Sequence, residues 1–81
     1  MKVRVKLFAV AKERAGRHDV TVDVPDVATV ADVRGAIANE CPGLADVLSH
    51  AVFAVNAEYA RDDTPVNDRS EVAIIPPVSG G

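Results

Sequence analysis

The sequence has one cysteine among 81 residues, which excludes an internal disulfide framework and a four-cysteine metal site. It also lacks any apolar run near the roughly 18 residues that a membrane helix needs. The opening Met-Lys-Val-Arg-Val-Lys alternates charged and apolar residues, unlike the continuous apolar stretch of a signal peptide. We therefore expect one small cytoplasmic domain held together by apolar packing in a reducing compartment.

Positive charge is scarce as well. Nine Lys and Arg residues stand against twelve Asp and Glu, a net charge of −3. A binder of the phosphate backbone would have to gather its few basic residues on one face, so nucleic acid is disfavoured as the main partner. A mildly acidic surface suits a basic protein partner better.

The sequence also shows no recognisable catalytic or metal-binding group of residues. His18 and His50 are far apart in sequence, with no carboxylate at metal-ligand spacing, and both are predicted to lie at the surface. Cys41 falls on an apolar helix face and is predicted to be a small core residue. No Ser–His–Asp arrangement or Gly-rich phosphate loop can be assembled. We expect no metal and no stably bound cofactor. The mixed-charge runs 12–14 and 61–63 are predicted to be solvated faces, with partner contact as the alternative.

Strand patterns are what the sequence does contain. Val3, Val5 and Leu7 alternate with charged residues, which predicts a half-buried strand. Other segments have similar alternation or a short continuous apolar run bounded by turn residues. The predicted strands span residues 2–8, 19–24, 52–55 and 72–75, with a weaker segment at 58–60.

Helix patterns lie between the strands. Residues 9–15 are rich in helix formers and end at Gly16. Thr29, followed three residues later by Asp32, resembles a capping box at the start of a longer helix. The apolar face of that helix is Val30, Val33, Ile37 and Cys41, and Pro42-Gly43 ends it. A short third helix is expected at 44–49, a polar loop at 61–65 and a turn at 67–70.

The order of these elements predicts an α+β fold: a mixed sheet with one main helix packed on one face. No internal repeat or linker appears, so residues 1–75 are predicted to form one domain. The first and last strands are both strongly apolar and are expected at the centre of the sheet. Residues 76–81 are predicted to form a flexible tail.

The C-terminal residues are the most informative. Pro76 and Pro77 have a fixed φ and no N–H donor, so they end the sheet and project the chain outward. After Val78 and Ser79, the final glycines leave the terminal carboxylate sterically open, on a tail thin enough to enter a narrow channel. An ordinary frayed terminus is the alternative, because Gly and Ser are common there.

At these residues a resemblance appears. Residues 71–81 (EVAIIPPVSGG) resemble the C-terminus of the small-subunit family of molybdopterin synthase (MoaD). Residues 5–16 resemble its first strand and helix, and 55–56 with 65–68 resemble its third quarter. The resemblance spans essentially the whole chain. Pro-Pro-Val-Ser-Gly-Gly is its specific part, whereas the β-grasp pattern is shared by ubiquitin-like folds in general.

The resemblance implies a ubiquitin-like β-grasp sulfur carrier. Gly81 would be adenylated by an ATP-using, MoeB-like activating enzyme and then converted to a thiocarboxylate. The tail (Pro76, Pro77, Val78, Ser79 and Gly80) would insert into the large subunit, MoaE. The thiocarboxylate would then give its sulfur to cyclic pyranopterin monophosphate in molybdenum cofactor biosynthesis. Ile75 is predicted to contact the partner, and the acid, base and metal groups are expected in the partners.

Two departures and two alternatives accompany this hypothesis. Ile74-Ile75 stand where family members often have an aromatic pair, and aromatic residues are common interface anchors. Arg69 stands where their turn often has glycine, which matters if that position needs positive φ. A carrier for another pathway, ThiS-like or for cysteine synthesis, would use the same tail chemistry. A ubiquitin-like protein modifier or an interaction module with an inert tail is the other alternative.

Overall fold

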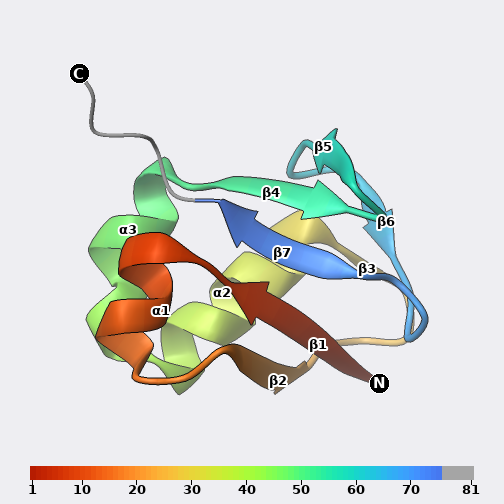
Figure 1. Cartoon of the computed structure of the whole chain (residues 1–81). Helices are drawn as coiled ribbons and strands as arrows, with labels where there is room; N and C mark the ends of the chain where they lie inside the picture. Colours follow the sequence, from red (N-terminus) through yellow and green to blue (C-terminus); the bar gives the residue numbers. More distant parts are fainter. Residues whose placement is uncertain (76–81) are drawn as a thin grey trace.

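The computed structural model describes residues 1–75 and centres on a five-stranded sheet in the order β2-β1-β7-β4-β5 (Figure 1). β1 and β7 run parallel, and the other neighbouring pairs are antiparallel. β7 is therefore central with β1 beside it, as the apolar character of these segments predicted. The strands are Lys2–Leu7 (β1), Asp19–Asp23 (β2), Val52–Val55 (β4), Glu58–Ala60 (β5) and Val72–Ile75 (β7).

The helices cover one face of this sheet, and α2, Val30–Glu40, is the main one (Figure 1). Its buried residues Val30, Val33 and Ile37 pack into the core with the inward side chains of the strands. The predicted capping box is present, and the Thr29 N–H donates to the Asp32 carboxylate at 2.9 Å. The shorter elements are α1 (Ala9–Ala15), a 3₁₀ turn (Pro42–Leu44) and α3 (Ala45–His50). The predicted α+β fold, a mixed sheet with one main helix, is thus confirmed.

A second, two-stranded sheet was not predicted. It pairs Ala28–Thr29 (β3) with Pro65–Val66 (β6), so the polar loop expected at 61–65 ends in a strand. The carbonyls of Thr64 and Asp62 accept the N–H groups of Val30 and Ala31 at 3.0 Å each. The loop therefore satisfies backbone donors in the first turn of α2, which have no partner within the helix. Two-residue strands have no hydrophobic period, so alternation cannot reveal them.

Arg34 ties α2 to three other parts of the chain. Its Nη1 donates to the carbonyls of Leu48 and Ala51, and its Nη2 lies 2.9 Å from an Asp62 carboxylate oxygen. The guanidinium also stacks over the Phe53 ring at 4.7 Å from its centroid. One half-buried arginine thus links the end of α3, strand β4 and the 61–64 loop.

The remaining single-residue predictions can now be compared with the structure. His18 and His50 are exposed, as predicted. Cys41 ends α2 rather than lying inside it; it is half-buried against the core, with the Arg17 Nη2 3.6 Å from its sulfur. It is therefore less enclosed than its predicted core position. Arg69 is not among the residues with positive φ, so the missing glycine causes no backbone strain there.

Two broader observations concern the part of the chain that the structure describes. None of its helices is both long and apolar enough to cross a bilayer. Within residues 1–75, no group of three or more His, Cys, Asp and Glu side chains is arranged to hold a metal ion.

Candidate functional site

The face of the sheet away from the helices has a charged half and an apolar half. On β1 and β2 the outward side chains form ion pairs across the strands. The Lys2 ammonium lies 2.9 Å from Asp23, and the Arg4 guanidinium 2.7 Å from Asp19. The hydrogen bond from Lys2, and then its positive charge, lower the pKa of Asp23. This half is consequently polar, and two of the three outward cations of β1 are paired.

The apolar half lies on β7, β4 and β5. The register places Ile75 opposite Val52 and Ala73 opposite Ala54, and Tyr59 is the neighbour of Ala54 on β5. Ala54 is buried yet stands outside the core cluster, because it faces away from the helices. With Ala57 from the β4–β5 turn, Ala54, Ala73, Tyr59 and Ile75 line a surface hollow.

Phe8 extends this apolar surface along β1. Leu7 points into the core, so Phe8, the next residue, emerges on the outer side. It shares a hollow with Arg4 and Lys6, whose side chains are on the open face. The parallel register Leu7 to Ile74 puts Phe8 and Ile75 at the same end of their strands. We call the following set the apolar patch: Phe8, Val52, Ala54, Ala57, Tyr59, Ala73 and Ile75.

The exposure of large side chains is concentrated in this patch. Phe8 is 48% exposed, Val52 44% and Tyr59 80%; the other exposed large hydrophobic residue within residues 1–75, Val27, is in the loop before β3. Contiguous exposed apolar surface on a small domain marks a site of protein contact, and aromatic residues are enriched at such contacts. The arrangement suits docking rather than chemistry.

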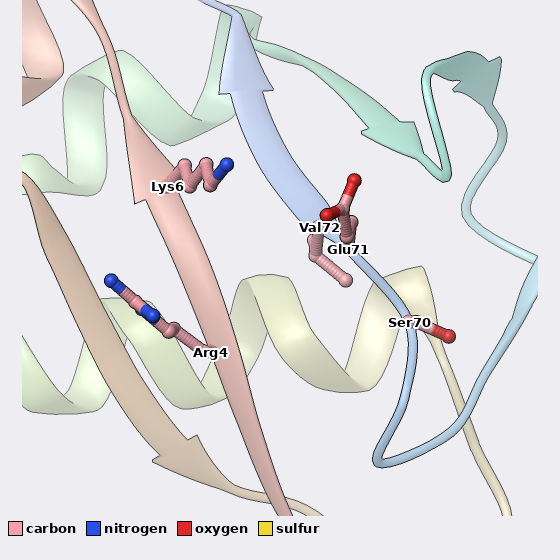
Figure 2. A pocket seen from close by; sticks show the side chains of 5 residues that line it. All are labelled: Arg4, Lys6, Ser70, Glu71 and Val72. Atoms are coloured by element: carbon pink, nitrogen blue, oxygen red, sulfur yellow. The ribbon is translucent and has the colours of Figure 1, made fainter.

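A neighbouring hollow is formed where β1 passes the start of β7. Figure 2 shows Arg4 and Lys6 extending from β1, with Ser70, Glu71 and Val72 on the other side. The Arg4 side chain runs toward β2 and the Lys6 side chain toward β7. The lining has no histidine or cysteine to pair with Ser70 as base or nucleophile.

The structure places only one of the predicted site residues. Ile75 is half-buried at the end of β7, inside the apolar patch. Gly81, the predicted reacting residue, and the predicted inserted segment Pro76, Pro77, Val78, Ser79 and Gly80 lie outside the described residues. β7, the last strand before them in the sequence, ends inside the apolar patch.

Sequence reasoning missed the other large members of the patch. Phe8 shares the outward parity of Lys2, Arg4 and Lys6, so an aromatic residue at that parity was a signal that could have been used. Val52 lies in a continuous apolar run, where alternation cannot tell the two faces apart. Tyr59 is in a three-residue strand whose pairing follows only from the turn before it.

Residues 5–81 match the ThiS family. The chain belongs to the ThiS family. Among its relatives, the "Molybdopterin synthase sulfur carrier subunit" of Arabidopsis thaliana is 40% identical over 81 residues, which cover this whole chain and 84% of that protein. The resemblance to the small-subunit family of molybdopterin synthase is thereby confirmed.

Solved structures agree with the fold of this ThiS-family chain. SAMP1 from Haloferax volcanii matches with a TM-score of 0.88 and 35% identity, over all of both chains. A complex of subunits 1 and 2 of the molybdopterin-converting factor from Helicobacter pylori contains a chain that matches with a TM-score of 0.70 and 26% identity, again over all of both chains. The ubiquitin-like β-grasp architecture is therefore shown.

Proposed function

We propose that this ThiS-family chain is the sulfur-carrier subunit of molybdopterin synthase. One observation carries the proposal: the central strand β7 ends at Ile75 inside an exposed apolar patch, so docking of the patch would deliver the tail to a partner. The names of full-length relatives support it. The Helicobacter pylori complex of subunits 1 and 2 supports a large-subunit partner, which would be MoaE.

The proposed chemistry takes place at the Gly81 carboxylate. A carboxylate is a poor electrophile, so one of its oxygens first attacks the α-phosphorus of ATP on a MoeB-like activating enzyme, releasing pyrophosphate. Sulfide sulfur from a donor then attacks the acyl-adenylate carbonyl, and AMP leaves with the C–O electron pair. The product is a thiocarboxylate. Gly80 gives clearance, so two different enzymes can reach the same carbonyl.

Sulfur delivery completes the proposed cycle. Pro76, Pro77, Val78 and Ser79 insert into the large subunit and position the thiocarboxylate beside cyclic pyranopterin monophosphate. The thiocarboxylate sulfur bonds to a pterin carbon as an oxygen substituent leaves that carbon with its bonding electron pair. Water then attacks the Gly81 carbonyl and cleaves its C–S bond, which leaves the sulfur on the pterin and restores the Gly81 carboxylate. This chain contributes the reacting group and the docking surface, while acid and base groups come from the partners.

The test is the intact mass of the chain after incubation with ATP, a sulfide source and the activating enzyme. We expect a gain equal to one oxygen exchanged for sulfur, and none in a variant lacking Gly81. The deletion should leave the melting temperature unchanged, since Gly81 lies beyond the last strand. An unchanged mass, with the enzyme shown to be active on its own carrier, would contradict the proposal. Co-purification of the large subunit separates this pathway from a ThiS-like or cysteine-synthesis carrier.

A second candidate is a ubiquitin-like protein modifier, whose terminus would form an isopeptide with a target lysine. The match to SAMP1 favours it, because SAMP1 aligns over its full length and the "Small archaeal modifier protein 1" of Haloferax volcanii is also 36% identical to this chain. The same activation of Gly81 would precede conjugation. Higher-mass conjugates in cell extracts, lost with the Gly81 deletion, would identify this activity.

A further inference from the structure

Charge is divided very unevenly along this chain. Residues 1–18 contain six of the nine Lys and Arg residues and one of the twelve Asp and Glu residues, a net charge of +5. The other 63 residues contain three cations and eleven carboxylates, a net charge of −8. The overall −3 therefore conceals a basic segment, which forms β1, α1 and the turn after them.

Part of this positive charge is neutralised within the sheet. Asp23 pairs with Lys2, and Asp19 receives two hydrogen bonds from Arg4, from Nε at 3.1 Å and from Nη2 at 2.7 Å. Lys6 and Lys12 have no such partner: neither forms an ion pair with any of residues 1–75.

The two unpaired lysines line the same hollow. Its other lining residues include Phe8, His18, Arg4 and Asp19. The Asp19 carboxylate is already paired with Arg4. Backbone hydrogen bonding fixes the base of the hollow, because the Leu7 N–H donates to the His18 carbonyl at 2.8 Å. We call Lys6, Lys12 and His18 the basic rim. Glu71, across the sheet, is a carboxylate near Lys6 but forms no ion pair with it (Figure 2).

The basic rim is continuous with the apolar patch. Phe8 of the patch lines the same hollow as the rim residues, and Lys6 pairs in register with Ala73 of the patch. A protein docked on the apolar patch would therefore also cover the basic rim. Unpaired cations beside an apolar contact are complemented by carboxylates, which guide association and fix its orientation.

We propose that the protein docking on the apolar patch presents an acidic segment, rich in Asp and Glu, to Lys6 and Lys12. This inference rests on the proposed docking of the large subunit and adds the chemistry of the contact. An acidic polypeptide fits better than a phosphate backbone, because the eleven carboxylates beyond residue 18 would repel a long polyanion. The basic partner expected from the net charge does not fit this surface.

The test compares two charge reversals of equal size. Lys6→Glu/Lys12→Glu removes the rim, and Arg61→Glu/Arg69→Glu makes the same change in net charge at exposed positions outside the rim. Binding to the large subunit is measured for both variants and for the unmodified chain, in low and high salt. We expect the rim variant to bind about tenfold more weakly in low salt, mainly through slower association. In about 1 M salt the difference should nearly vanish, since screening then acts within roughly 3 Å.

Each outcome has a distinct meaning. If both variants bind equally more weakly, the loss reflects net charge alone and the inference is overturned. Unchanged binding by the rim variant would overturn it as well. If the unmodified chain fails to bind the large subunit, the proposed function fails instead.

The inference then has its own test. The peptide Glu-Asp-Glu-Leu-Asp-Glu is titrated into the ¹⁵N-labelled chain. Saturable shifts of the Phe8, Lys12 and His18 amides, lost in the rim variant, would support the acidic segment. No shifts, or tighter binding of a DNA duplex at the same amides, would overturn it.

Discussion

At the scale of single residues, the two central residues of the β4–β5 turn, Asn56 and Ala57, differ in how well they tolerate a left-handed backbone conformation. Asn56 and Ala57 both have positive φ, at 53° and 68°, as a two-residue hairpin turn with primed geometry requires. Asn56 uses this conformation: its N–H donates to the Glu71 carbonyl at 2.8 Å, and its side-chain oxygen accepts the Glu71 N–H at 2.9 Å. Ala57 holds a conformation in which its Cβ is unfavourable.

Ala57→Gly should therefore stabilise the free chain. Relief of left-handed strain outweighs the extra flexibility that glycine gives the unfolded chain, so we expect a gain of about 1 kcal/mol in the free energy of unfolding. Gly16→Ala is the matched opposite: Gly16 has φ 71° and nothing within 4 Å of an added Cβ, so only strain changes. It should destabilise by a similar amount. Urea unfolding measures both, and equal signs for the two variants would contradict this explanation.

At the scale of secondary-structure elements, the β1–β2 pair combines register with charge. The antiparallel register puts Lys2 directly opposite Asp23. Opposite charges at facing positions stabilise a strand pair modestly, and the hydrogen bond between them lowers the pKa of Asp23 below its ordinary value.

Lys2→Met should return the pKa of Asp23 toward its ordinary value, which an NMR titration of the carboxyl carbon measures. Because the folded pKa is the lower one, the pair contributes stability above the unfolded pKa of about 3.9. That contribution is lost as the pH falls through the folded pKa. Lys6→Met is the control, since Lys6 forms no ion pair with Asp23. An unchanged Asp23 titration in Lys2→Met would show that the contact is not maintained in solution.

The elements also show how far sequence can predict the fold. β1, β2, α2 and the capping box at Thr29 were predictable because each has one clear period or cap within a single segment. β3 and β6 could not be predicted, because a strand of two residues is too short to show hydrophobic alternation and because the two strands come from distant parts of the sequence. The apolar patch was only partly predictable. Ile75 was inferred from the tail, whereas Val52 and Tyr59 join it through cross-strand register.

At the scale of the whole molecule, the helices shield one side of the sheet and leave the apolar patch open (Figure 1). Most of the exposed large apolar side chains are gathered on this face, at the end of the strand that leads into the tail. Within residues 1–75, the exposed apolar surface is thus on the open face of the sheet, where β7 ends.

Tyr59→Asp should weaken binding to the large subunit by about tenfold or more, because it puts a charge in the apolar contact. Val27→Asp provides the control, since Val27 is 92% exposed but lies outside the patch. The affinity of this variant for the large subunit should stay within about twofold of that of the unmodified chain. Neither exposed position should change stability by more than about 0.5 kcal/mol. Calorimetric titration measures affinity, and equal loss in both variants would contradict the assignment of the docking surface.

The parallel pairing of β1 with β7 also determines when this chain can fold during its synthesis. Val5 and Val72 are partners although they are 67 positions apart in the sequence. β1 leaves the ribosome early, but β7, which completes the centre of the sheet, emerges only after all the other described strands. Until then β1 and β4 have no neighbour between them, and their unpaired edges are open to other chains. Folding of this domain on the ribosome must therefore wait for residues 72–75, and a nascent chain stalled before them is exposed to aggregation.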